Sequence, residues 1–323
     1  MARVPTVFFG SGTFALPALA RLASGVADAV SPGAALVDLA AVITAPPRPA
    51  GRRGELQPTP VALAAEARGI PVLTPVSLRR DEALSELRAL GADLVVLADY
   101  GRLIPSALLE LPRYGALNLH PSLLPRHRGA APVAATILAG DAVTGVTLMR
   151  MDEGLDSGPI LAQREVLLDG TEIAPDLEAH LAVVAADLLV EMLPAWLAGT
   201  LEARSQPADG ATLTRPLRRS DGLLDPERPA VELERQVRAY QPWPGSFLAA
   251  EGERLIIWRA VPIEEPDETE VSGSAGGGVG TLVPLGETLA LRTGQGLLRL
   301  DEVQPAGRRR MSGAEYRRGH RGA

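Results

Sequence analysis

The sequence predicts an α/β fold with a mostly parallel sheet, followed by a small β-barrel. In roughly the first two thirds of the 323 residues, short apolar and β-branched runs alternate with helical stretches. Continuous apolar strands between helices indicate a parallel sheet that is covered on both faces. In the last third, short apolar runs follow one another at even spacing with Gly turns between them, which is typical of a small barrel. We therefore expect a Rossmann-like domain at residues 1–205 and an OB-like barrel within residues 206–323.

Strands of the first domain are expected where apolar runs are bounded by turn-forming residues. These runs lie at residues 6–10, 37–44, 92–99, 116–120 and 144–151. Helices are expected around residues 14–24 and 60–68, between the first three of these strands. The apolar stretch 181–199 contains Asp187 and Glu191, so we expect a packed helix there rather than a membrane span.

The second domain is expected to begin with a linker, because residues 205–216 are rich in small and polar residues. A helix is expected at residues 230–240. Strands are expected at residues 254–261, 279–286, 288–294 and 296–303. The Gly- and Ser-rich segment 272–278 predicts a flexible loop within this domain.

Composition and charge exclude some classes of function. Cys is absent, which excludes disulfides, a thiolate nucleophile and a Cys-ligated metal. The net charge of −7 argues against a general nucleic-acid coat, but it leaves room for a local basic face. Two arginine clusters qualify: Arg48, Arg52 and Arg53, and Arg308, Arg309 and Arg310. Such clusters also occur as solvated faces or flexible tails.

The N-terminal segment 1–20 has a basic residue, an apolar run and small residues, as a signal peptide has. However, Gly10, Ser11 and Gly12 interrupt the run where a strand-turn-helix requires them. We therefore expect a cytoplasmic protein.

The same turn could belong to a dinucleotide-binding site, because Gly10 to Ala15 fits the pattern G-x-G-x-x-G/A. A dinucleotide site also needs an acidic residue at the end of the second strand, for the ribose. That strand ends in Ile43-Thr44-Ala45, and Asp38 lies at its beginning. The glycines are thus expected to form a tight turn, with an oxidoreductase as the less favoured alternative.

Asn118 and His120 end one of the expected strands. Alternate side chains of a strand share a face, so these two point together while Leu117 and Leu119 point into the packing. They lie at the carboxyl end of a strand, where open α/β sheets hold their ligands. The alternative is an Asn and a His whose hydrogen bonds are satisfied by neighbouring backbone.

An acidic, Gly-punctuated loop follows the strand at 144–151 and contains Asp152, Glu153 and Asp156. These residues are common turn formers. If the strand before this loop neighbours the strand 116–120, however, a carboxylate reaches the imidazole of His120. A carboxylate beside a His raises its pKa and fixes its tautomer.

The motif of residues 117–132, followed by residues 144–161, resembles the family of formyltransferases that use 10-formyltetrahydrofolate. This resemblance implies a catalytic set of Asn118, His120 and Asp156. It also implies a folate-binding loop formed by Ser122, Leu123, Leu124 and Pro125. The formyl donor is a cosubstrate, and no metal is expected.

The residue types suit formyl transfer. A primary amine attacks the formyl carbon, an oxyanion develops, and the folate nitrogen leaves. We expect Asn118 and a protonated His120 to stabilise the oxyanion, an effect worth about 10²–10³ in rate for one such donor. Asp156 is expected to move the proton from the attacking to the leaving nitrogen, directly or through water.

The catalytic set does not choose the formyl acceptor. Members that formylate glycinamide ribonucleotide stop near the end of the first domain, whereas this chain continues. A formyltetrahydrofolate hydrolase or dehydrogenase and a nucleotide-aminosugar N-formyltransferase remain open, and the segment 238–247 does not separate them. A non-catalytic RNA-binding protein on the same scaffold is a further alternative.

Two segments favour an RNA acceptor. Residues 45–61 and 303–313 resemble the corresponding segments of the family members that formylate methionyl initiator tRNA. The resemblance implies that tRNA is the partner and that the two arginine clusters defined above contact its phosphates, which position an RNA without reading its sequence. No membrane or obligate protein partner is expected.

Overall fold

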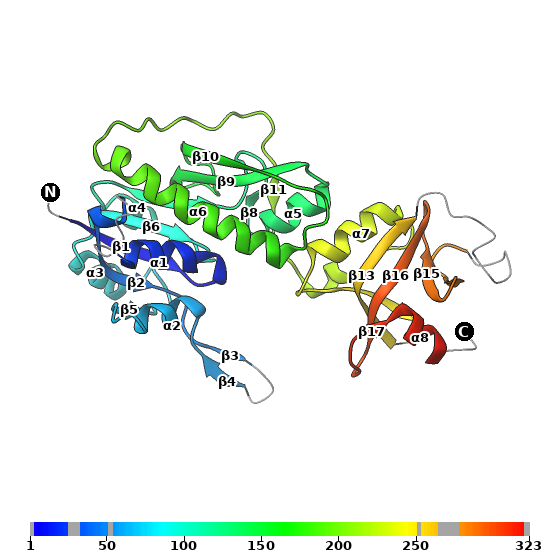
Figure 1. The fold of residues 1–323 in the computed structure, drawn as a ribbon. Coiled ribbons are helices and arrows are strands. Elements are labelled where there is room, and N and C mark those ends of the chain that lie inside the picture. Colours follow the sequence, from blue (N-terminus) through cyan, green and yellow to red (C-terminus); the bar gives the residue numbers. More distant parts are fainter. Residues whose placement is uncertain (1–2, 25–32, 51–53, 251–252, 264–277, 320–323) are drawn as a thin grey trace. The chain divides into compact units, whose positions relative to one another are not determined.

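The computed structural model describes residues 3–24, 33–50, 54–250, 253–263 and 278–319 (Figure 1). The chain divides into two compact units. The first contains Met1–Pro132, Val143–Leu167 and Glu178–Arg215, and the second contains Val133–Ala142, Leu168–Leu177 and Pro216–Ala323. Compactness does not show which segments fold independently, so domains 1–205 and 206–323 remain a prediction.

A mixed sheet forms the centre of the first unit, in the order β10-β9-β7-β6-β1-β2-β5. Its strands are β1 (Val4–Gly10), β2 (Val37–Ile43), β5 (Val72–Leu73), β6 (Leu94–Ala98), β7 (Ala116–His120), β9 (Val143–Arg150) and β10 (Ile160–Leu167). Neighbouring strands from β5 to β7 run parallel, whereas β9 is antiparallel to both β7 and β10. The predicted α/β fold with a mostly parallel sheet is confirmed.

Helices cover both faces of this sheet, as its continuous apolar strands require. Phe9 and Leu97, on one face, lie in one cluster with Leu87 of α3 (Asp81–Ala89) and Leu108 of α4 (Ser106–Leu109). Figure 1 shows α1 (Leu16–Ser24) and α6 (Ala174–Leu197) in front of the other face. These two helices are joined by an ion pair of 2.7 Å between Arg21 and Asp187.

The predicted packed helix is α6. It is long and apolar enough to cross a membrane, judged by length and composition alone. Leu181, Leu189 and Leu193 on this helix are all 0% exposed. Burial of these side chains shows that α6 contributes to the hydrophobic core, as the sequence predicts.

The arginine-containing segment 45–61 contains a short hairpin. Strand β3 (Arg48–Ala50) pairs with β4 (Glu55–Gln57) in antiparallel fashion, with Arg48 opposite Gln57. Helix α2 (Pro60–Glu66) follows, and its start is set locally, because Thr59 accepts a hydrogen bond of 3.0 Å from Ala62 N–H.

The second unit is built on an antiparallel sheet in the order β12-β13-β16-β15-β14, with β17 beside β16. Its strands are β12 (Ser246–Ala250), β13 (Glu253–Ile263), β14 (Leu282–Leu285), β15 (Thr288–Arg292), β16 (Leu297–Pro305) and β17 (Met311–Ser312). Leu233 and Val237 of α7 (Ala230–Ala239) pack against the inner side chains of β13 and β16. The expected barrel-like domain is confirmed; most of its predicted flexible loop, 272–278, lies outside the described residues.

Helix α8 (Gly313–Gly319) ends the described chain. A Cβ at Gly313 would lie 2.0 Å from the carbonyl oxygen of Leu300. Only Gly permits this close approach of α8 to β16, and it allows Tyr316 to enter the core of the unit.

Candidate active site

Asn118 and His120 share one face of β7, as their spacing predicts. Strand β9 is the antiparallel neighbour of β7, so its carboxyl end lies beside Leu117 rather than beside His120. The loop that follows β9 must therefore turn back over the sheet to bring Asp156 to these side chains. The predicted neighbourhood of the two strands is confirmed, although the path of the loop is not the one that parallel strands would give.

The three side chains named by the family resemblance meet in the structure. The Asn118 amide nitrogen donates to Asp156 Oδ1 at 3.4 Å, and His120 Nδ1 lies 3.7 Å from Asp156 Oδ2. The His120 side chain is 5% exposed and that of Asp156 is 16% exposed. An amide donor, an imidazole and a carboxylate thus converge in a nearly water-free place, where electrostatic interactions are strong.

Asp156 is held from several sides. Its backbone has a positive φ of 48°, an uncommon conformation that Asp tolerates better than most residues. Its Oδ2 accepts a hydrogen bond of 2.8 Å from Gly129 N–H. The Gln206 amide donates to the carbonyl oxygens of Asp156 and Gly158, both at 2.8 Å. These contacts fix the direction of the carboxylate.

The structure revises the expected charge of His120. Burial lowers its pKa below the ordinary value, and this effect exceeds the opposing influences of the Asp156 charge and the His127 carbonyl. The lowered pKa favours a neutral resting imidazole, whereas the sequence predicts a protonated one. Its tautomer is also fixed by a backbone group: His120 Nε2 lies 2.9 Å from the His127 carbonyl oxygen, which can only accept. Nδ1 is left unprotonated and faces Asp156.

The predicted folate-binding loop, Ser122 to Pro125, is held largely by its own hydrogen bonds. Ser122 is 0% exposed, and its hydroxyl donates to the carbonyl oxygen of Arg126 at 2.7 Å. Leu124 is buried beside Met149 and Ile160. Leu123 and Pro125 are half-buried, so these two side chains, rather than the Ser122 hydroxyl, present surface to a ligand.

Two residues that sequence reasoning did not select support the site. Thr147 is 0% exposed; its hydroxyl donates to the Ser122 carbonyl oxygen at 2.7 Å and accepts from Leu124 N–H at 3.0 Å. Gln206 lies in the segment that reads as a linker, and Arg128 donates to its Oε1 at 2.7 Å. Nothing in the composition of that segment distinguishes Gln206 from an ordinary linker residue.

A second acidic group, Asp99, directly follows β6 and lies beside the turn between β1 and α1. A Cβ at Gly12 would lie 1.7 Å from Asp99 Oδ2, so only a glycine at position 12 leaves room for this carboxylate. Asp99 is exposed as a whole residue, yet its pKa is raised to about 6, mainly because the surrounding protein removes water from the carboxylate and in addition because of the charge of Glu178. A carboxylate in this position would repel a pyrophosphate, which argues further against a dinucleotide at the turn.

The basic residues are distributed as follows. Arg48 is exposed on β3, and Arg52 and Arg53 lie outside the described residues. Arg308, Arg309 and Arg310 are exposed in the turn between β16 and β17. Arg309 lies 3.8 Å from Glu315, and Arg310 lies 4.0 Å from Glu302.

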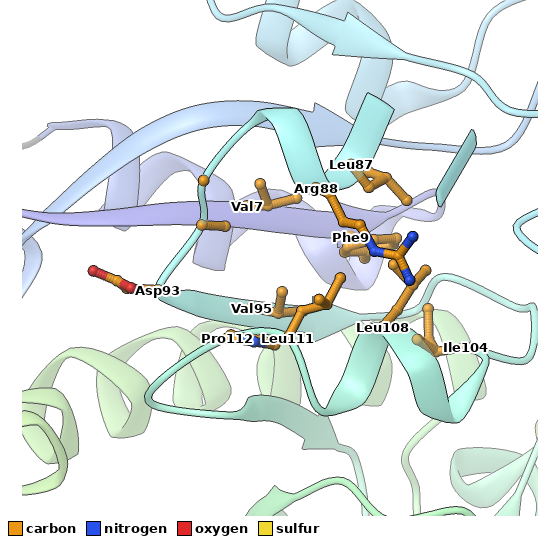
Figure 2. Close-up of a pocket in the computed structure, with 12 residues that line it drawn as sticks. Val7, Phe9, Leu87, Arg88, Asp93, Val95, Ile104, Leu108, Leu111 and Pro112 are labelled. Atoms are coloured by element: carbon orange, nitrogen blue, oxygen red, sulfur yellow. The ribbon is translucent and has the colours of Figure 1, made fainter. Parts of the chain in front are cut away.

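A separate cavity of about 270 Å³ lies between α3, α4 and the strands β1 and β6. Figure 2 shows Val7, Phe9 and Val95 on the strands, with Leu87 and Leu108 from the two helices around them. Asn118, His120 and Asp156 do not line this cavity. It is therefore not the place where the three candidate catalytic groups meet. Within the described ranges, no group of three or more His, Cys, Asp or Glu side chains is arranged to hold a metal ion.

Comparison with known families gives two matches along the chain. The model described as formyl transferase matches residues 6–193, and the model described as formyl transferase, C-terminal domain, matches residues 216–321.

Curated relatives match nearly the whole chain. The methionyl-tRNA formyltransferase of Chloroflexus aurantiacus is 44% identical over 310 residues, which cover 96% of this chain and 95% of that protein. The methionyl-tRNA formyltransferase of Novosphingobium aromaticivorans is 46% identical over 313 residues, which cover 97% and 96%.

Solved structures with the same fold include an N-formyltransferase from Helicobacter canadensis in complex with folinic acid and dTDP-3-aminofucose. It has a TM-score of 0.62 and 16% identity, and the match covers 94% of this chain and 100% of that one. HypX from Aquifex aeolicus in complex with tetrahydrofolic acid has a TM-score of 0.59 and 15% identity, covering 98% and 47%. At these identities the likeness shows the fold alone.

Proposed function

The chain belongs to the formyltransferase family, and we propose that it transfers the formyl group of 10-formyltetrahydrofolate to the amino group of methionyl initiator tRNA. The observation that carries the reaction type is the convergence of Asn118, His120 and Asp156. The observation that carries the acceptor is the 44–46% identity, over nearly the full length, to relatives that are methionyl-tRNA formyltransferases.

The surroundings of the three groups fit a folate cosubstrate. Leu123 and Pro125 are half-buried and offer apolar surface on the loop that directly follows the strand of Asn118 and His120. Ligand sites combine a mostly apolar wall for a ring system with a few placed polar groups for the reacting atoms. The cosubstrate supplies a formyl group bound to nitrogen, and the chain supplies the groups that handle charge and protons.

Asn118 is placed to stabilise the negative charge that develops on the formyl oxygen. A carboxamide has two N–H hydrogens, and the bond to Asp156 uses one of them. The second hydrogen is available to an oxyanion, and a donor of this kind contributes about 10²–10³ in rate.

Asp156 and His120 form the proton-handling part of the site. The α-amine of the acceptor has an ordinary pKa near 8, so about a tenth of it is neutral at pH 7, and the harder step is removing its proton after attack. The Asp156 carboxylate and the unprotonated Nδ1 of His120 lie 3.7 Å apart. Either group can accept that proton and pass it to the folate nitrogen, which leaves as its bond to the formyl carbon breaks. Acid–base assistance of this kind contributes about 10²–10⁴ in rate.

The proposed RNA contacts use the two arginine clusters. Arg48 in the hairpin segment and Arg308, Arg309 and Arg310 in the turn after β16 are exposed cations of the kind that bind phosphates. Because α6 contributes to the core, we place the reaction in the cytoplasm. No membrane or obligate protein partner is part of the proposal.

A substrate comparison tests the function. The full-length protein and 10-formyltetrahydrofolate are incubated with methionyl initiator tRNA or with a nucleotide-linked aminosugar, and formylated product is measured. We expect product with the charged tRNA at a kcat/KM far above that with the aminosugar. Asp156→Asn serves as the impaired control and should lower kcat by about 10²–10⁴. Preference for the aminosugar would contradict the proposed acceptor, and a fully active Asp156→Asn enzyme that folds correctly would contradict the role of Asp156.

A further inference from the structure

The outer face of the second unit's sheet carries aromatic side chains. Along β13, Leu255 and Ile257 are buried in the core, whereas the alternate residues Arg254, Ile256 and Trp258 are half-buried on the opposite face. Ile256 is paired with Phe247 of β12 and with Gln304 of β16, so these two side chains share that face. We call Phe247, Arg254, Ile256, Trp258 and Gln304 the aromatic face.

Arginines lie over both rings of the aromatic face. The guanidinium carbon of Arg254 is 3.8 Å from the ring centre of Phe247, and that of Arg310 is 3.5 Å from the ring of Trp258. The indole N–H of Trp258 donates to Gln304 Oε1 at 2.9 Å. Cation–π contacts and this hydrogen bond hold the rings in fixed orientations at a partly exposed surface.

An exposed tryptophan stands in the loop before β12. Trp243 is 54% exposed, and among the aromatic residues of the described ranges it alone is exposed. Its loop is fastened to the aromatic face, because Gln241 donates to the Trp258 carbonyl oxygen at 2.8 Å and Arg254 donates to that of Pro244 at 3.3 Å. The fold thus holds a large apolar ring in water, beside the aromatic face.

The same face is joined to a basic turn. The Gln304 amide donates to the Arg308 carbonyl oxygen at 2.8 Å, and the turn continues through Arg309 and Arg310. The Arg309 side chain is 84% exposed and the Arg310 side chain is 50% exposed. The acidic neighbours Glu302 and Glu315 lie 4.0 Å and 3.8 Å from these arginines, so at the surface they screen the cations only weakly.

We propose that Trp243, beside the aromatic face, stacks an unpaired nucleotide of the tRNA while the turn Arg308–Arg310 contacts the adjoining phosphates. Flat rings interleaved with guanidinium groups are the combination that single-stranded nucleic acids bind, because every base has a π-face and every nucleotide has a phosphate. This charge complementarity favours RNA over an apolar protein partner. The inference rests on the proposed function. Stacking adds to the free energy of tRNA binding a contribution that salt does not weaken in the way it weakens the phosphate contacts.

Substitution of Trp243 tests the proposal in the full-length enzyme, with charged initiator tRNA as the probe. Stacking is worth about 1–3 kcal/mol per base, or roughly 5- to 150-fold, so Trp243→Ala should raise KM for the tRNA about 10-fold and lower kcat little. Trp243→Phe keeps a ring and should recover most of the loss. Because no phosphate contact is removed, the salt dependence of tRNA binding should be unchanged in Trp243→Ala and reduced in Arg308→Gln.

Val279→Ala is the control, because Val279 is 43% exposed in the same unit and is not part of the aromatic face; it should leave KM unchanged. A KM within about twofold of wild type for Trp243→Ala, or an equal loss for Trp243→Phe, would overturn the stacking role while leaving formyl transfer standing. Conversely, wild-type protein that fails to formylate the tRNA but binds it in a Trp243-dependent way would support the stacking surface and overturn the proposed reaction.

Discussion

At the scale of single residues, the local environment changes the chemistry of groups whose identity is plain from the sequence. His120 and Asp156 interact, and a carboxylate alone would raise the pKa of the imidazole. Burial of His120 acts in the opposite direction and prevails. If the resting imidazole is neutral, the role we propose for His120 is that of a proton acceptor beside Asp156 and not that of a charged donor to the oxyanion.

The effect of the protein environment on the pKa of Asp99 can be tested by measuring how protein stability depends on pH. Its pKa is raised from 3.8 to about 6, so the folded state binds a proton more tightly than the unfolded state does. The resulting stabilisation is fully present below about pH 4 and is lost as pH rises through about 6. We compare the melting temperature of Asp99→Asn with that of wild type at the same pH. We expect this difference to shift in favour of the variant as the pH rises across this window. A shift of two units corresponds to about 3 kcal/mol for a buried group, and solvent at Asp99 reduces the expected gain to about 1 kcal/mol.

Thermal unfolding at pH values between 4 and 8 measures this difference, with Asp209→Asn at an exposed loop position as the control. His120 has the opposite sign, because its lowered pKa makes stability fall as pH drops below its ordinary value. Comparing each variant with wild type at the same pH removes that contribution. An equal effect of Asp99→Asn at pH 4 and pH 8 would show that the charge of Asp99 does not cause it.

At the scale of elements, the segment between α6 and the second unit supports the candidate active site as well as linking the two units. Its short strand β11 (Leu213–Thr214) pairs with β8 (Arg128–Gly129), and Gln206 donates to two carbonyl oxygens of the Asp156 loop. A stretch of small and polar residues thus becomes a support for the site, because its backbone and side-chain groups find partners on neighbouring loops.

We expect Gln206→Glu to lower kcat about 10-fold, because a carboxylate keeps the acceptor for Arg128 but loses both donors to the Asp156 loop. The expected loss falls on kcat more than on KM for either substrate, since Gln206 positions Asp156. Steady-state kinetics at neutral pH measure the split. Unchanged kcat in a normally folded variant would show that the Asp156 loop keeps its geometry without Gln206.

At the scale of the whole molecule, two compact units share one chain, and the proposed chemistry and part of the proposed RNA binding lie in different units. The first unit supplies Asn118, His120 and Asp156, and the second supplies the aromatic face and the turn Arg308–Arg310. This division predicts that donor chemistry and tRNA affinity can be separated by shortening the chain.

We expect a chain that ends after Arg215 to retain donor hydrolysis and lose most of its tRNA affinity. A chain that ends after Ser205 should lose both, because it lacks Gln206 and Thr212, whose hydroxyl accepts from His127 N–H at 2.8 Å. Release of formate from the donor and binding of charged tRNA are the two measurements. Tight tRNA binding by the first truncated chain would contradict an RNA-binding role for the second unit.

The sequence by itself determined the α/β architecture, because apolar runs of strand length between helices can be buried only as a sheet covered on both faces. It also placed Asn118 and His120 on one face, since the period of a strand is two residues. Only the tertiary structure decided how Asp156 reaches them, which neighbours hold it, and that His120 is neutral. Those properties depend on strand direction, on contacts between Gln206 and a loop about 50 residues earlier, and on exclusion of water, and none of these is a property of a local stretch of chain.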